Sequence, residues 1–377
     1  MTRLTTKVFA GGVLASLVLA LTACGSSGDS GSSAGASLTS DAVATATSDL
    51  APYTGQASEF PVDEPLATKP PAGTTFAFLQ CSTPVCAAQA ELIGIATKTL
   101  LGNDLIVVKA GPSAQEEQQA MDSIIAKKPS AVIIPATDPA AFRSQMDELD
   151  QDGIPVITTG VIGTDKYPAV KGGILAETLS TLAGKLFADW VVKNVGAVES
   201  AFYTIPELSF SPLMEQGYKD EMAALCPGCA VREVKVPLAS VGSTAPQAIT
   251  NDLKAHPDTK AAIFASEEAT TGLPAALKVA GINVAINGFA PSPTILDYIQ
   301  KGDITAGLAV DSLVTEFMNV DMAARVVTGQ QLTGDEADDR LAMQMITKDD
   351  IAGMDLTKGF SAYPDAVERF TKLWNGQ

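Results

Sequence analysis

Four of the five cysteines fall into two close pairs, Cys81 with Cys86 and Cys226 with Cys229. Outside the cytoplasm, cysteines at such spacing oxidise, so we predict the disulfides Cys81–Cys86 and Cys226–Cys229. The segment Cys226-Pro-Gly-Cys229 also fits a thioredoxin-like redox motif or half of a zinc site. No second cysteine pair or histidine cluster accompanies it to complete a metal site. Two disulfides that staple loops are therefore the favoured interpretation.

The single histidine, His256, is the residue type best suited to acid–base catalysis near neutral pH. It precedes a predicted strand and so lies at the amino end of a sheet, whereas ligands bind at the carboxyl ends. The sequence carries no nucleophile elbow, phosphate-binding loop or metal signature. We therefore predict that His256 occupies a turn, and that the protein is not an enzyme and has no catalytic residue, metal or cofactor.

The fifth cysteine, Cys24, ends the segment Leu21-Thr-Ala-Cys24. This segment follows two basic residues and an apolar run over 8–21, which is the layout of a secretory signal peptide. It resembles the lipobox of bacterial lipoproteins, which implies removal of residues 1–23 and acylation of Cys24. An extracytoplasmic protein anchored to the cell membrane is then expected. An uncleaved anchor helix is the alternative, but the run is shorter than the about 20 residues that such a helix needs.

Composition sets the remaining bounds. The net charge of −18 argues against nucleic acid as a partner, because its phosphate backbone is also anionic. Hydrophobic residues make up 46% of the chain and charged residues 18%, which predicts a large buried core. Residues 25–40 are rich in Gly and Ser, and prolines recur as far as Pro71. We therefore predict a flexible, lipidated tether over residues 24–72.

From Thr74 onward, short apolar runs alternate with helical segments, and the pattern repeats after about residue 170. Continuous apolar runs indicate parallel strands buried on both faces, so the fold class is α/β with two doubly wound lobes. A ligand cleft is expected between the lobes, at the carboxyl ends of the strands. Predicted strands cover 75–80, 105–108, 131–134, 155–158, 201–205, 231–236, 261–264, 284–286 and 305–310, with 341–346 as an extra strand. Predicted helices cover 87–101, 114–126, 139–153, 178–195, 212–225, 245–255, 273–280, 294–300 and 366–374.

Several segments resemble the ribose-binding-like (type I) periplasmic binding proteins, which deliver solutes to ABC importers. The clearest is 253–272, where a His-Pro-Asp turn, a strand, Ser266-Glu267-Glu268 and a helix follow one another. Supporting matches lie at 131–138, 153–157, 287–289 and 297–304. The resemblance implies a small-molecule ligand, ABC permease and ATPase partners, and a monomer. It implies a first lobe over 73–160 and 311–339, a second lobe over 161–310 and 340–377, and crossovers near Thr159, Asp311 and Asp339.

The sequence departs from the sugar-binding members of that family at three places. Ser266-Glu267 stands for Asn-Asp, Gly288-Phe289-Ala290 stands for Gly-Phe-Asp, and no arginine precedes Gly217. Charged and planar groups, which satisfy paired sugar hydroxyls, are thereby lost. Apolar side chains are frequent in the same segments, at Leu208, Phe210, Met214 and Phe289. We expect a sugar-like ligand or a less polar organic compound.

The predicted ligand contacts follow the strand ends that would face the cleft. Asp138 fits equally well as a helix N-cap, and Glu267 has a cleft-edge salt bridge as its alternative role. Thr159 also suits a hinge, Phe210 a packing role and Glu207 a solvated position. The full set, from the sequence and the resemblance together, is Ser82, Thr83, Asp138, Thr159, Glu207, Phe210, Glu267, Phe289 and Asp311.

Three functions fit these observations. The principal one is a lipid-anchored solute-binding protein whose lobes close on a ligand and present it to a membrane permease. The second keeps the fold but makes the protein a receptor subunit that signals occupancy to a membrane sensor. The third is an extracellular thiol oxidoreductase that uses Cys226 and Cys229.

Overall fold

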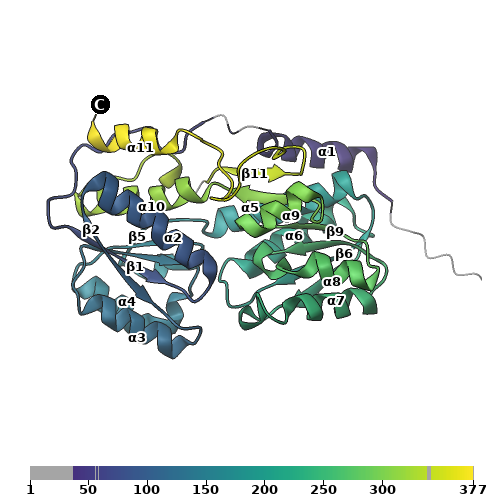
Figure 1. The fold of residues 1–377 in the computed structure, drawn as a ribbon, viewed down its shortest axis with the longest axis horizontal. Helices are drawn as coiled ribbons and strands as arrows, with labels where there is room; N and C mark the ends of the chain where they lie inside the picture. The colour runs from purple at the N-terminus through teal and green to yellow at the C-terminus, as the bar shows by residue number, and fades with distance from the viewer. Residues whose placement is uncertain (1–36, 56, 58, 338–340, 377) are drawn as a thin grey trace, which may run out of the picture. The chain divides into compact units, whose positions relative to one another are not determined.

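The computed structural model describes residues 37–55, 57, 59–337 and 341–376. Its first lobe is built on a five-stranded parallel sheet with the strand order β2-β1-β3-β4-β5 (Figure 1). Four of these strands coincide with predicted apolar runs, and the side chains of three of them, β1, β3 and β4, are almost all buried. The strands are β1 Thr75–Gln80, β2 Asp104–Lys109, β3 Ala131–Pro135, β4 Val156–Thr159 and β5 Val170–Ile174.

Helices follow each strand of this lobe. The predicted helix over 87–101 begins earlier, at Pro84, and continues as a π-helical segment. A capping box formed by Ser113 and Glu116 starts α3 as predicted. The elements are α2 Pro84–Gly94, η2 Ile95–Leu101, α3 Ala114–Ile125, η3 Pro139–Phe142, α4 Arg143–Gln151 and η4 Thr164–Lys166.

The strand β5 corrects the predicted end of the first lobe at residue 160. It pairs in parallel with β4, so this part of the first lobe extends through Ile174 and the first crossover follows that residue rather than Thr159. The segment Val-Lys-Gly-Gly-Ile has no apolar run, because two of its residues are glycines and one is a lysine. The pattern that identified the other strands is therefore missing here.

The second lobe has a four-stranded parallel sheet with the order β7-β6-β8-β9. Beside it lies an antiparallel pair, β10 with β11, which a bridge between Phe289 and Leu308 joins to the end of β9. The strands are β6 Glu199–Thr204, β7 Val231–Lys235, β8 Thr259–Phe264, β9 Ala285–Gly288, β10 Gly307–Val310 and β11 Met343–Ile346. The helices are α5 Glu177–Asn194, α6 Ser211–Leu225, η5 Leu238–Ser240, α7 Ala245–Ala255, η6 Glu267–Thr270, α8 Leu273–Ala280 and α9 Pro293–Lys301.

Glycines bring α5 and α6 into close backbone contact. A Cβ atom on Gly184 would lie 2.0 Å from the Met214 carbonyl oxygen, and one on Gly217 would lie 2.3 Å from the Thr181 carbonyl oxygen. Both contacts are with backbone, which has little freedom to move. These two positions therefore require glycine for the helices to pack at this distance.

The chain leaves β10 of the second lobe just before Asp311, near which the second crossover was predicted. Asp311 caps the helix α10, Ser312–Val327, which packs on β3, β4 and α2 of the first lobe. The short helix η7, Gly334–Glu336, contacts β5. The third predicted crossover position, Asp339, is outside the described residues.

The end of the chain corrects the assignment of all of 340–377 to the second lobe. The strand β11 does belong there, because it pairs with β10. The last helix, α11 Ala366–Asn375, instead packs on α10. Its Phe370 and Trp374 rings lie 5.3 and 5.7 Å from the Phe317 ring of α10. Because these aromatic rings are buried against α10, the last helix belongs to the first lobe.

The predicted tether is also corrected within 24–72. Residues 24–36, with Cys24, are outside the described residues, but Ser40–Leu50 form the helix α1 and Ala51–Tyr53 the turn η1. The helix packs on α5 and α6 through Ala42, Ala46 and Leu50. This face is made mainly of alanines, so it carries little of the hydrophobic contrast that marks an amphipathic helix. In the described part of the chain, no helix has the length and apolar character needed to span a membrane.

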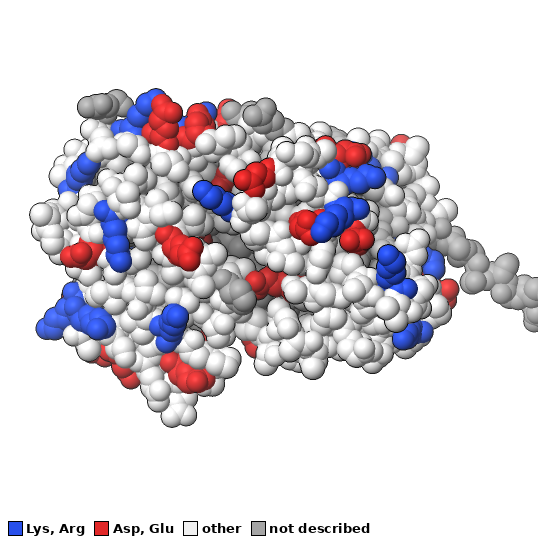
Figure 2. All heavy atoms as spheres, in the orientation of Figure 1, with Lys and Arg blue, Asp and Glu red and all other residues white. Residues whose placement is uncertain are grey.

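Charged side chains are scattered over the face shown in Figure 2. Blue and red groups alternate there, and much of the visible surface is uncharged. This distribution agrees with the low content of charged residues, 18% of the chain.

Candidate ligand-binding site

Ser209 joins the two lobes at the carboxyl ends of β4 and β6. Its hydroxyl donates a hydrogen bond of 2.8 Å to the Gly160 carbonyl oxygen and accepts one of 3.3 Å from the Ile162 amide. Gly160 and Ile162 follow β4 of the first lobe, whereas Ser209 lies in the loop between β6 and α6 of the second. We call this set of bonds the Ser209 clasp. Sequence reasoning missed Ser209, although it named the adjacent Phe210.

Two predicted residues, Phe210 and Phe289, lie together beside the clasp. Their ring centroids are 6.1 Å apart, with the planes at 55°, and both side chains are buried. Gly160 lies against the first ring, because a Cβ atom there would be 3.0 Å from Phe210 Cδ1. Its φ of +69° is also a conformation that favours glycine. An aromatic surface from the second lobe thus meets bare backbone of the first.

Two alanines at strand ends have left-handed backbone conformations, with φ of +36° at Ala136 and +56° at Ala290. Ala136 follows β3 and its amide donates to the Thr159 carbonyl, while the Ala290 amide donates to the Leu308 carbonyl. Such conformations are rare for alanine and concentrate at functional sites. Ala290 is also one of the positions where the sequence departs from the family that it resembles.

Thr159 is buried and faces α10. Its hydroxyl donates to Asn319 Oδ1 at 2.8 Å, and Asn319 Nδ2 donates to Glu316 Oε2 at 3.0 Å. Gln89 Nε2 donates to the other carboxylate oxygen, Glu316 Oε1, at 2.8 Å. Burial raises the pKa of Glu316 to about 7, although both hydrogen bonds act to lower it. The Thr159 side chain therefore belongs to an internal polar network that connects β4, α10 and α2.

Two predicted carboxylates act as helix caps. Asp138 is exposed and accepts a hydrogen bond of 2.9 Å from the Ala140 amide. Asp311 is buried and accepts bonds from the amides of Val314, at 3.1 Å, and Ala362, at 2.8 Å. Burial raises the pKa of Asp311, and these backbone bonds act to lower it. Asp311 thus ties the start of α10 to the segment that leads into α11.

Glu267 lies inside the second lobe. A Cβ atom on Gly288 would be 2.3 Å from Glu267 Cγ, and one on Gly307 would be 3.0 Å from Glu267 Oε2. The side chain is fully buried, and neither carboxylate oxygen has a hydrogen-bond partner among the described residues. Burial raises its pKa well above the ordinary value. Its backbone contacts the aromatic pair, since the Glu267 amide donates to the Phe289 carbonyl at 3.1 Å.

The remaining predicted residues lie on the surface or at its edge. Ser82 and Glu207 are exposed, and Thr83 is the N-cap residue of α2, with its hydroxyl 3.2 Å from Cys81 Sγ. Both predicted disulfides, Cys81–Cys86 and Cys226–Cys229, are present. His256 is the C-cap residue of α7, ahead of β8 as predicted.

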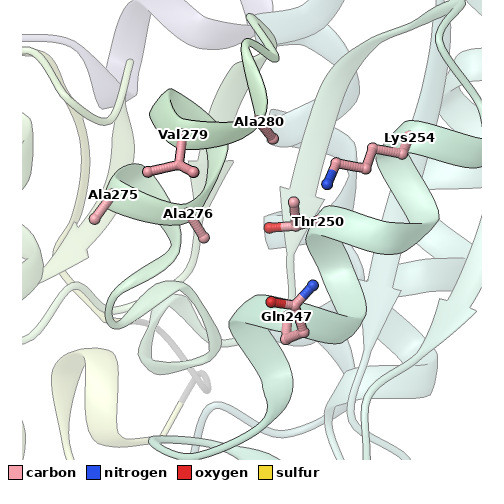
Figure 3. A pocket seen from close by; sticks show the side chains of 7 residues that line it. All are labelled: Gln247, Thr250, Lys254, Ala275, Ala276, Val279 and Ala280. Atoms are coloured by element: carbon pink, nitrogen blue, oxygen red, sulfur yellow. The ribbon is translucent and has the colours of Figure 1, made fainter.

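A separate hollow of about 350 Å³ lies between α7 and α8 (Figure 3). None of the predicted ligand contacts lines it, and Val279 at its edge is 91% exposed. Its lining residues are Gln247, Thr250, Lys254, Ala275, Ala276, Val279 and Ala280. The hollow is therefore a surface feature of the second lobe, distinct from the Ser209 clasp.

Known proteins share features of this sequence and this fold. The sequence model of the periplasmic binding protein domain matches residues 84–331. A solute-binding protein from Agrobacterium vitis, solved with alpha-D-tagatopyranose, is 20% identical with a TM-score of 0.62, covering 74% of this chain and 97% of that one. A 5-methylthioribose transporter solute-binding protein from Thermotoga lettingae is 15% identical with a TM-score of 0.66, covering 79% and 98%. No curated protein was found to match the sequence.

The same fold also occurs in a putative LacI transcriptional regulator from Bacteroides fragilis, which is 15% identical with a TM-score of 0.61 and covers 74% of this chain and 98% of its own. Likeness at this level of identity establishes the fold and leaves the function to be argued from the site. The match of the family model over most of the chain is a separate finding. The chain therefore belongs to the periplasmic binding protein domain family, and its two parallel-sheet lobes have the type I fold of the sugar-binding proteins in that family.

Proposed function

We propose that this protein is an extracytoplasmic solute-binding protein of an ABC importer, held at the membrane by a lipid on Cys24. The observation that carries the proposal is the Ser209 clasp, where loops at the carboxyl ends of the two sheets meet. A ligand that contacts both loops favours the closed arrangement over an open one. Membership of the periplasmic binding protein domain family supports the same role.

The proposed ligand is a small sugar-like compound with an apolar portion. Phe210 and Phe289 supply an aromatic surface, and Ala290 supplies a methyl group beside it. Polar groups of the clasp, the Ser209 hydroxyl and the Gly160 carbonyl, lie beside this surface. Such a combination suits a molecule with one hydrogen-bonding side and one apolar side. The similar proteins solved with tagatopyranose and with 5-methylthioribose give two starting compounds that differ in this respect.

A thermal-shift screen tests the ligand class. The full chain, purified in mild detergent, is melted with D-tagatose, D-allose, 5-methylthioribose and aromatic carboxylic acids. A ligand that binds only the folded state at about 100 times its Kd stabilises the protein by about 2.7 kcal/mol. We expect the larger shift from compounds with an apolar substituent. A shift with the unsubstituted sugars alone would contradict the proposed apolar contact.

Substitution separates binding from general stability. Phe289→Ala should weaken binding of the best compound at least about tenfold, because a buried aromatic contact is lost. Met354→Ala is the matched control, since Met354 is an exposed hydrophobic residue. Equal affinities of the two variants would refute the placement of the ligand at the aromatic pair.

Cell experiments test import and anchoring. Cys24→Ser should release the protein from the membrane fraction, because no acyl chain can be attached. Uptake of the labelled ligand should require this gene together with a permease and an ATPase. Binding without dependence of uptake on the gene would instead favour a receptor that reports occupancy to a membrane sensor.

A further inference from the structure

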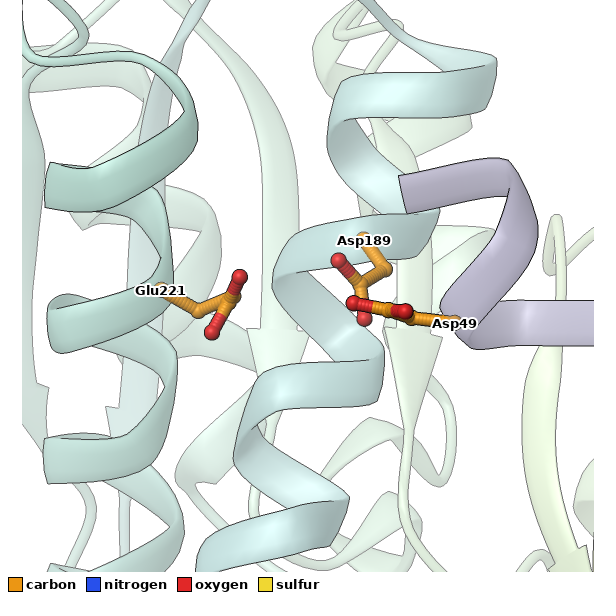
Figure 4. A group of neighbouring side chains, drawn as sticks. All are labelled: Asp49, Asp189 and Glu221. Atoms are coloured by element: carbon orange, nitrogen blue, oxygen red, sulfur yellow. The ribbon is translucent and has the colours of Figure 1, made fainter. Parts of the chain in front are cut away.

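Three carboxylates from three helices gather on the second lobe, away from the Ser209 clasp. Asp49 comes from α1, Asp189 from α5 and Glu221 from α6 (Figure 4). One carboxylate oxygen of each lies within 4.8 Å of the others. We call this group the three-helix acidic cluster. Like charges at such spacing repel, so the arrangement needs something that offsets the charge.

Asp189 is the member that points to a ligand. Its side chain is only 2% exposed, and its Oδ1 atom has no hydrogen-bond partner among the described residues. Figure 4 shows its carboxylate next to that of Asp49, with Glu221 across from both, so the group is directed into the cluster. A buried carboxylate without a partner is costly unless a proton or a cation neutralises it.

The residues that the structure describes supply little positive charge here. The charged groups that act on Asp189 are Glu221, Asp49 and Lys185. Lys185 Nζ is 4.0 Å from Glu221 Oε2, and its side chain is 48% exposed. Burial, followed by the two neighbouring carboxylates, raises the pKa of Asp189 to about 7. One half-exposed ammonium therefore opposes three carboxylates, and a net negative site remains.

We propose that the three-helix acidic cluster binds a calcium ion. Its donors are all carboxylate oxygens, which suit hard cations such as Ca²⁺, whereas structural zinc sites use cysteine and histidine. Two oxygens on opposite sides of Ca²⁺ are about 4.8 Å apart, given Ca–O distances of about 2.4 Å, so the measured spacing of the donors accommodates the ion. Exposed Asp49 leaves an entry path, and water completes the coordination.

The consequence of binding is mechanical. The helix α1 rests on α5 and α6 through two alanines, Ala42 and Ala46, and one larger apolar residue, Leu50. A calcium ion shared by Asp49, Asp189 and Glu221 holds the three helices together. The helix α1 is then fixed to the second lobe when calcium is present and is held less firmly when calcium is absent.

The test is a calcium titration of the full chain in detergent, after treatment with a chelator. Calorimetry should show a site with a Kd of about 0.1 to 1 mM, the range of extracellular calcium modules. Asp189→Asn should weaken it at least about tenfold. Asp220→Asn removes the same charge from an exposed neighbour of Glu221 and should bind as the wild type does. Calcium should also slow amide hydrogen exchange in residues 42–50 of the wild type and of Asp220→Asn.

Several outcomes would overturn the proposal. No heat and no change in exchange up to about 5 mM Ca²⁺ would show that the cluster holds only protons. Equal binding by Asp189→Asn would place the ion elsewhere. Magnesium binding as strong as calcium binding would refute the choice of ion. Asp189→Asn removes a buried charge, so its melting temperature without calcium should be at least that of the wild type, and a fall would show a structural role instead.

Discussion

The pH dependence of stability should be set in part by Glu316. This carboxylic acid is buried on α10, and the groups that contact it are the amides of Gln89 and Asn319. Burial raises its pKa from the ordinary 4.5 to about 7. Glu316→Gln removes the titration while keeping the shape of the side chain and one carbonyl acceptor.

The size of this effect on stability follows from the pKa values of Glu316 in the unfolded and the folded chain. Below pH 4.5 the acid is protonated in both the folded and the unfolded chain, so its titration costs nothing. Between 4.5 and about 7 the unfolded chain loses the proton while the folded chain keeps it, so stability falls as pH rises. The difference between these two pKa values corresponds to a change of about 3 kcal/mol in the free energy of unfolding. The stability of Glu316→Gln relative to the wild type should therefore improve by that amount between about pH 4.5 and pH 8.

Urea unfolding at a series of pH values measures this difference. Tryptophan emission is a suitable probe, because Trp374 packs on Phe317, the neighbour of Glu316 on α10. The exposed Glu148→Gln is the control for a simple change of charge. A constant offset between Glu316→Gln and the wild type from pH 4.5 to 8 would refute the reasoning, because it would show that Glu316 titrates alike in both states.

Three further substitutions test the packing and the lobe contacts. Gly217→Ala should lower stability by about 2 to 4 kcal/mol in thermal unfolding, because its Cβ atom would lie 2.3 Å from the Thr181 carbonyl; Gly94→Ala, whose nearest neighbour is 3.9 Å away, should not. Ser209→Ala should shift the ligand-free protein about three- to tenfold toward open forms, seen as a larger radius of gyration in solution scattering. Asp311→Ala should cost about 2 kcal/mol in thermal unfolding, because three buried amides lose their acceptor, and it should leave affinity for the screened ligand within about twofold.

Strands were predictable where an apolar run is buried on both faces, as in β1, β3 and β8. The strand β5 was not, because glycines and a lysine replace the run. The helix α10 was missed for the opposite reason. Nearly every residue from Val314 to Arg325 is buried, so no polar face marks the helical period. Both failures arise where neighbouring segments, and not the local pattern, decide the environment.

The candidate site shows the same division. Phe210 and Phe289, both predicted as ligand contacts, have ring centroids 6.1 Å apart, because both follow strand ends of one sheet, which lie close together. The direction of the Glu267 side chain could not be read from its own segment. It depends on space left by Gly288 and Gly307, which belong to two other strands. The clasp at Ser209 depends on a carbonyl in the other lobe, and serine hydroxyls accept many partners.

The segment from α1 to Leu66, which we call the leader, adds a connection between the lobes that the fold itself does not require. Its helix α1 packs on α5 of the second lobe. The side-chain amide of Gln344, on β11, donates to the Gly55 carbonyl. Farther along, the Glu64 carbonyl accepts from Arg325 of α10, and the Leu66 amide donates to the Leu373 carbonyl of α11. Any movement of one lobe against the other must therefore bend the leader or break some of these bonds. The free-energy cost of moving the lobes apart is therefore shared between the crossovers and the leader, whose sequence resembles a simple tether.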